Sequence, residues 1–132
     1  MCIRDRDELI LAKNYMYLIE TRFENDYQFT IKEENLVTDT FLPSGVLLTA
    51  LENIVKHNQP EINSVISTTI RVENEKVKVT NTISKPKEAN ESFGTGLKNL
   101  KKRYELLSDK MIEIEESEKD FILTLPLLKI VD

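Results

Sequence analysis

Apolar residues recur at three- and four-residue spacing over residues 7–23, where Leu9, Ala12, Met16, Ile19 and Phe23 share one side. This is the period of an α-helix that buries one face. The same spacing predicts further helices over residues 43–58 and 95–108, the last with Leu97, Leu100, Tyr104 and Leu107 on one side. Pro43 suits a first helical turn, where its missing N–H would have no partner.

Apolar and polar residues alternate elsewhere, which is the period of half-buried strands. The alternation predicts strands at 27–33, 64–72, 76–84, 111–116 and 120–128. The polar connection 73–75 fits a hairpin, and Pro126 marks an edge strand or a strand end. This order predicts an α/β two-layer sandwich, in which about three helices cover one face of a mixed, mainly antiparallel sheet.

Two segments show no regular recurrence of apolar residues. Residues 85–93 (KPKEANESF) form a long polar loop, of the kind that often serves as a lid or a binding loop. Residues 1–6 (MCIRDR) are interpreted as a non-native or truncated leader and set aside from the fold, which leaves one domain over 7–132.

The composition of the chain excludes or disfavours several kinds of partner and site. The chain has 132 residues, 18 Lys and Arg against 23 Asp and Glu, and a net charge of −5. That balance disfavours nucleic-acid partners, because duplex binding requires phosphate neutralisation. One Cys and one His exclude an internal disulfide and a Cys/His zinc site. No apolar run is long enough to span a membrane, so we expect a cytoplasmic domain.

A polar stripe on the 43–58 helix is the first candidate site, formed by Thr49, Glu52, Asn53, Lys56 and His57. Acid and amide oxygens suit Mg²⁺, and a lysine ammonium suits phosphate. The alternative is an ordinary solvated helix face.

The second candidate is the turn Gly94-Thr95-Gly96-Leu97, which holds two of the three glycines and opens a helix. Glycine lets the backbone approach a ligand, and a helix N-terminus attracts anions. An ordinary loop-to-helix turn is the alternative.

The third candidate is Asn81, which continues the core face of Val77, Val79 and Ile83. A buried amide needs partners, and a flat heterocycle lying against the sheet could supply them. The alternative is a strand end at which Asn81 caps the following loop.

Taken in order, these motifs resemble the catalytic ATP-binding (GHKL, or Bergerat) domain of sensor histidine kinases, and the LytS-like kinases above all. LPSGVLLTALENIVKHN resembles the N box of that family, and GTGLKNLKKRYELL its second glycine box. The resemblance covers residues 7–128. It implies ATP and Mg²⁺ as ligands.

Residue roles are carried over by the resemblance alone. Asn53 would coordinate Mg²⁺, Glu52 would position the metal or the reacting groups, and Lys56 and His57 would contact phosphate or ribose. The phosphates would be covered by Gly94, Thr95, Gly96 and Leu97, and Asn99 lies in the matching helix start. Asn81 stands where an Asp normally accepts the adenine amino proton. Residues 85–93 would be the lid.

The sequence departs from the family in three respects. Thr80-Asn81-Thr82-Ile83-Ser84 replaces the usual DxGxG box, and Leu48-Thr49-Ala50 stands where Gln and Pro are frequent. The single His57 already belongs to the nucleotide helix, so an acceptor histidine must lie outside this chain.

The resemblance implies phosphoryl transfer from Mg-ATP to that histidine, by a domain that is inactive without its phosphoacceptor helical domain. A LytTR-type response regulator, a homodimeric full-length protein and a membrane anchor upstream are also implied. The alternatives are a non-catalytic nucleotide-binding module, a Ser kinase of the anti-sigma type, and a plain interaction domain.

Overall fold

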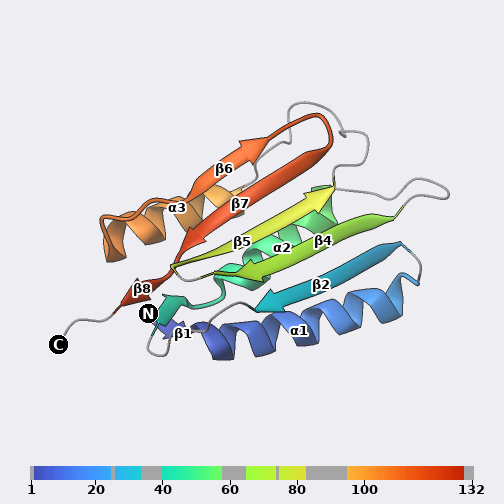
Figure 1. The fold of residues 1–132 in the computed structure, drawn as a ribbon, viewed down its shortest axis with the longest axis horizontal. Coiled ribbons are helices and arrows are strands. Elements are labelled where there is room, and N and C mark those ends of the chain that lie inside the picture. Colours follow the sequence, from blue (N-terminus) through green and yellow to red (C-terminus); the bar gives the residue numbers. More distant parts are fainter. Residues whose placement is uncertain are drawn as a thin grey trace.

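The computed structural model describes residues 2–24, 26–33, 40–57, 65–73, 75–82 and 95–129. These residues form two layers, with a five-stranded sheet in one and helices packed against a single face of that sheet in the other (Figure 1). The predicted α/β sandwich with a mixed, mainly antiparallel sheet is confirmed.

The main sheet has the strand order β2-β4-β5-β7-β6. Its strands are β2 (Tyr27–Glu33), β4 (Ile66–Val72), β5 (Lys76–Thr82), β6 (Glu113–Glu116) and β7 (Asp120–Pro126). β2 pairs with β4 in parallel, and every other pairing is antiparallel. The alternation in the sequence located all five, and β7 ends at Pro126 as predicted.

Three helices are described: α1 (Asp5–Arg22), α2 (Val46–His57) and α3 (Thr95–Leu107). α2 contacts both α1 and α3, so it occupies the middle of the helical layer. The predicted apolar stripes form the core with the inward residues of β4 and β5. Leu107 is the exception: it is 43% exposed, because α3 ends at this residue, one turn past the buried Tyr104.

A second, smaller sheet was not predicted. It has the order β1-β3-β8 and consists of β1 (Cys2–Arg4), β3 (Thr40–Pro43) and β8 (Leu128–Lys129). Setting residues 1–6 aside from the fold was therefore wrong, since residues 2–4 pair with β3 and α1 already begins at Asp5. The Asp5 carboxylate is buried and accepts a hydrogen bond of 2.9 Å from the Thr40 hydroxyl.

Placing Pro43 in a first helical turn was also wrong, because Pro43 ends β3 and α2 begins at Val46. A side chain of another helix sets this start. The Glu8 carboxylate of α1 is fully buried and accepts hydrogen bonds of 3.0 Å from the N–H groups of Gly45 and Leu47. It satisfies donors that a helix start leaves without partners.

Candidate functional site

The two faces of α2 separate as its pattern predicts. Its apolar stripe is buried, namely Leu47, Ala50, Leu51 and Ile54. On the other stripe Glu52 and Lys56 are exposed, while Thr49 and Asn53 are half-buried. His57 is the last residue of α2, and its side chain lies outside the described part of the chain. The four described side chains of the predicted polar stripe are therefore at least partly accessible on one face of α2.

The charge of Glu52 on α2 acts on a tyrosine of the neighbouring helix α1. Burial raises the pKa of the Tyr15 hydroxyl on α1, and the charges of Glu52 and Tyr27 raise this pKa further. The carboxylate of Glu52 is therefore close enough to Tyr15 to disfavour a tyrosinate there.

Asn81 is buried beneath the helical layer, as the continuation of the Val77 and Val79 face predicts. Its Nδ2 donates a hydrogen bond of 3.1 Å to the Thr82 carbonyl, which can only accept. The amide orientation is thereby fixed, and Asn81 Oδ1 is left without a hydrogen-bond partner. Leaving a buried polar atom unsatisfied costs about 1–3 kcal/mol.

Thr68 stands directly opposite Asn81 on the neighbouring strand β4. It is 1% exposed, and its Oγ1 also has no hydrogen-bond partner. Thr68 was not predicted as a site residue, although a signal was present: a hydroxyl sits between Ile66 and Ile70 in the buried row of β4. These two oxygens are the only buried side-chain polar atoms that lack partners in the described part of the chain.

The C-terminal half of α2 lies over the end of the sheet that holds this pair. The Tyr27 hydroxyl, at the start of β2, donates to the Val55 carbonyl at 3.5 Å. Tyr27 is in register with Ile66, two residues before Thr68. Asn53 and Lys56 flank Val55 on α2, so they belong to the same end of the domain.

The start of α3 points toward that end as well. Arg103 Nη2 donates a hydrogen bond of 2.6 Å to the Ser44 carbonyl, which places the later half of α3 beside the beginning of α2. The two helices run in opposite directions in Figure 1. Thr95 lies eight residues before Arg103, about 12 Å along the axis, and therefore toward the C-terminal half of α2.

The glycine turn is described only in part. Thr95 and Gly96 lie in the first turn of α3, where Leu97 is buried and Asn99 is exposed. Gly94 and the predicted lid at 85–93 lie outside the described residues, as does Ile83.

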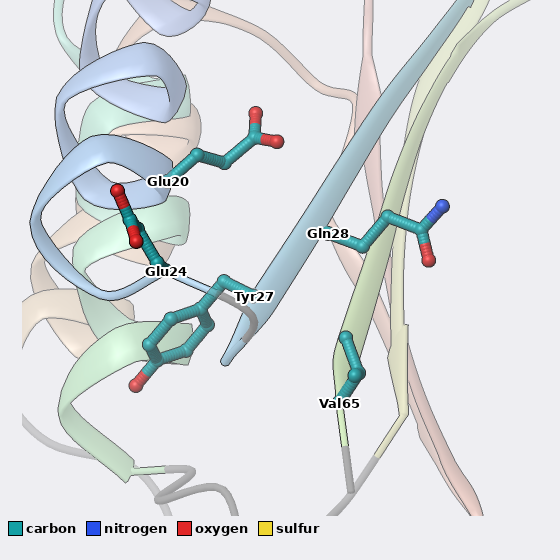
Figure 2. Close-up of a pocket in the computed structure, with 5 residues that line it drawn as sticks. All are labelled: Glu20, Glu24, Tyr27, Gln28 and Val65. Atoms are coloured by element: carbon teal, nitrogen blue, oxygen red, sulfur yellow. The ribbon is translucent and has the colours of Figure 1, made fainter.

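A separate hollow of about 430 Å³ opens between the end of α1 and the starts of β2 and β4. Its lining residues are Glu20, Glu24, Tyr27, Gln28 and Val65. Figure 2 shows Glu20 reaching from α1 toward β2 and the ring of Tyr27 directed toward α2. These five lining residues include two carboxylates and no cation, so the hollow would repel a phosphate. None of the five belongs to the predicted site.

No group of three or more His, Cys, Asp or Glu side chains suited to a metal ion occurs within the described ranges. A Mg²⁺ ion held mainly by substrate phosphates and water needs only one or two protein oxygens. None of the described helices is long and apolar enough to cross a membrane.

No protein-family model matches the sequence, and no curated protein matches it. Solved structures do match. The nucleotide-free catalytic domain of histidine kinase ThkA has a TM-score of 0.61 and 18% identity, with 96% of each chain covered. The cytoplasmic segment of histidine kinase QseC has a TM-score of 0.61 and 13% identity, with 98% of this chain and 78% of that chain covered.

The mycobacterial sensor histidine kinase MprB has a TM-score of 0.53 and 12% identity, with 98% of this chain and 99% of that chain covered. The sequence identities are low, so the three solved structures share with this chain an architecture, which extends over nearly the whole length of the chain. The chain therefore has the fold of the catalytic domains of histidine kinases.

Proposed function

We propose that this domain binds Mg-ATP between the C-terminal half of α2 and the Thr68–Asn81 pair, and that it passes the γ-phosphoryl group to a histidine outside this chain. The observation that carries the proposal is the pair of buried, unpartnered oxygens at the end of the sheet beneath α2. Buried polar atoms are normally hydrogen-bonded, so a ligand that supplies the missing partners explains the pair.

Adenine offers the complementary groups. Its exocyclic amino group donates, and Asn81 Oδ1 is an acceptor of fixed orientation. The Thr68 hydroxyl can donate to a ring nitrogen of the base. Both oxygens are below the surface, so binding requires the side chains over that end of the sheet to move apart.

The polar face of α2 suits the metal and the phosphates. In this proposal the Asn53 amide oxygen coordinates Mg²⁺, Glu52 positions the metal or the reacting groups, and Lys56 and His57 contact phosphate or ribose. The backbone at residues 94–97 supplies N–H groups to the phosphates, and Asn99 lies in the same helix start. When bound, Mg²⁺ would supply charge neutralisation at the phosphates, while the protein would mainly position the groups.

The finer assignment rests on the sequence motifs. We propose a LytS-like sensor kinase, with residues 85–93 as the lid, a phosphoacceptor-histidine helical domain of the same protein, a homodimeric and membrane-anchored full-length chain, and a LytTR-type response regulator. ThkA has been crystallised in complex with the response regulator protein TrrA, and that structure is similar to this chain with a TM-score of 0.59, 19% identity and 96% of this chain covered. It supports a regulator as partner.

Binding is tested by the stability that Mg-ATP confers. At one hundred times its dissociation constant, Mg-ATP should raise the free energy of unfolding by about 2.7 kcal/mol. Asn53→Ala should abolish this gain, whereas Asn14→Ala, at an exposed position on α1, should retain it. An equal gain in the Asn53→Ala variant would contradict the site.

Transfer is tested by labelling with γ-phosphate-labelled ATP in the presence of an added acceptor-helix segment. Acid-labile label on that segment supports the histidine kinase. Acid-stable label on a separate protein supports the Ser kinase, and a stability gain without any label supports the non-catalytic module.

A further inference from the structure

The face of the main sheet turned away from the helices carries a row of cations. Lys32 on β2 is in register with Arg71 on β4, and Arg71 is in register with Lys78 on β5. Figure 1 shows this face toward the viewer, with α2 and α3 behind the strands. Three positive side chains therefore stand side by side across three neighbouring strands, in a protein with a net charge of −5.

Such a row concentrates positive charge at one place on the sheet. Lys32 is exposed, but Arg71 and Lys78 are half-buried, so water screens their charges less fully. The row therefore forms a positive patch on this face of the sheet, which attracts anions.

The row lies in a hollow of about 420 Å³. Its lining residues are Lys32, Thr69, Arg71, Glu73, Lys78, Thr80 and Ile122. Thr69 and Thr80 are opposite residues in the next row, and their hydroxyls can donate to an anion. The carboxylate in the lining, Glu73, has a cation partner of its own, since Lys76 Nζ lies 3.7 Å from its Oε2.

We propose that this row, Lys32–Arg71–Lys78, binds a multiply charged phosphate anion of the diphosphate class. Neighbouring strands are about 4.8 Å apart, so the three cations span about 10 Å, which suits two linked phosphoryl groups better than one carboxylate. The guanidinium of Arg71 can form two parallel hydrogen bonds to a phosphoryl group. An acidic peptide fits less well, because Ile122 is the one large apolar side chain among these lining residues.

This site is independent of the proposed nucleotide site. Side chains at successive positions of a strand point to opposite faces, so the row on β4 and β5 lies on the other side of the sheet from Thr68 and Asn81. The test therefore uses the Asn53→Ala variant, in which nucleotide binding is expected to be lost.

Inorganic pyrophosphate is titrated into isotope-labelled Asn53→Ala protein at constant ionic strength, without Mg²⁺, and backbone amide shifts are followed by NMR. We expect saturable shifts at residues 32, 69–71 and 78–80. Adding Arg71→Gln and Lys78→Gln should weaken binding by about tenfold or more. The control pair Lys101→Gln and Lys102→Gln, at exposed positions of α3, removes the same charge and should leave the affinity unchanged.

Three outcomes would overturn the proposal: shifts spread equally over all lysines, equal loss of affinity in both double variants, or tighter binding of a hexaglutamate peptide than of pyrophosphate.

Discussion

Thr68 and Asn81 are opposite residues on β4 and β5, and each holds a buried oxygen that has no hydrogen-bond partner in the described structure. Around them the same face of both strands is apolar, with Ile66, Ile70 and Val79 all buried. The pair thus places two polar groups in a position where folding alone favours apolar ones. Stability and ligand binding should therefore respond in opposite directions when these groups are removed.

Thr68→Val tests this relationship most directly, because valine has nearly the shape of threonine without its hydroxyl. The substitution removes an unsatisfied buried polar atom and should raise the free energy of unfolding of the ligand-free protein by about 1 kcal/mol. It should also weaken ATP binding. Urea denaturation and ATP titration measure the two effects.

Thr124→Val is the matched control, since Thr124 on β7 is half-buried on the opposite face and does not line the hollow of the Lys32–Arg71–Lys78 row. It should leave ATP affinity unchanged. If Thr68→Val destabilised the ligand-free protein and left ATP binding intact, the hydroxyl would have a structural role instead.

Asn81→Asp distinguishes recognition of a base from simple packing. The carboxylate keeps an acceptor where Oδ1 stands and adds a charge, so binding of adenine nucleotides should be preserved or strengthened. The ligand-free protein should become less stable, because a buried charge without a partner is costly. A large loss of ATP affinity in this variant would mean that the side chain does not face the base.

The sequence predicted those parts of the fold that depend on local periodicity. Alternation located the five strands of the main sheet, and the apolar row of β5 was enough to single out Asn81 as a polar residue on a buried face. The small sheet and the start of α2 were missed. β1 and β8 are short, and the start of α2 is fixed by Glu8, 37 residues before Gly45, which no local pattern reveals.

Glu8→Gln tests this long-range cap. The glutamine side chain keeps one carbonyl acceptor but replaces the other with a donor, which would face the N–H of Gly45 or of Leu47. The free energy of unfolding should fall by about 2 kcal/mol, because hydrogen bonds to charged groups are the stronger kind. Glu20→Gln, at an exposed residue of the same helix, should change it by less than about 0.5 kcal/mol. Equal effects in chemical denaturation would contradict the cap.

Tyr15 gives a pH dependence whose sign follows from its surroundings. Burial raises the pKa of the Tyr15 hydroxyl above 10.0, and the charges of Glu52 and Tyr27 raise it further. The folded protein therefore keeps the hydroxyl proton at a pH where the unfolded chain has lost it. The corresponding stability is complete below pH 10.0 and is lost as the pH rises through the folded-state value.

Tyr15→Phe should therefore make the fall in unfolding free energy above pH 10.0 less steep. Tyr17→Phe controls for the loss of a tyrosine at a site that is 69% exposed. Glu52→Gln should shift the tyrosinate absorbance attributed to Tyr15 toward lower pH, because it removes a nearby negative charge. If the absorbance titration of Glu52→Gln matched that of the wild type, Glu52 would not face α1, and its place beside the proposed metal would have to be reassigned.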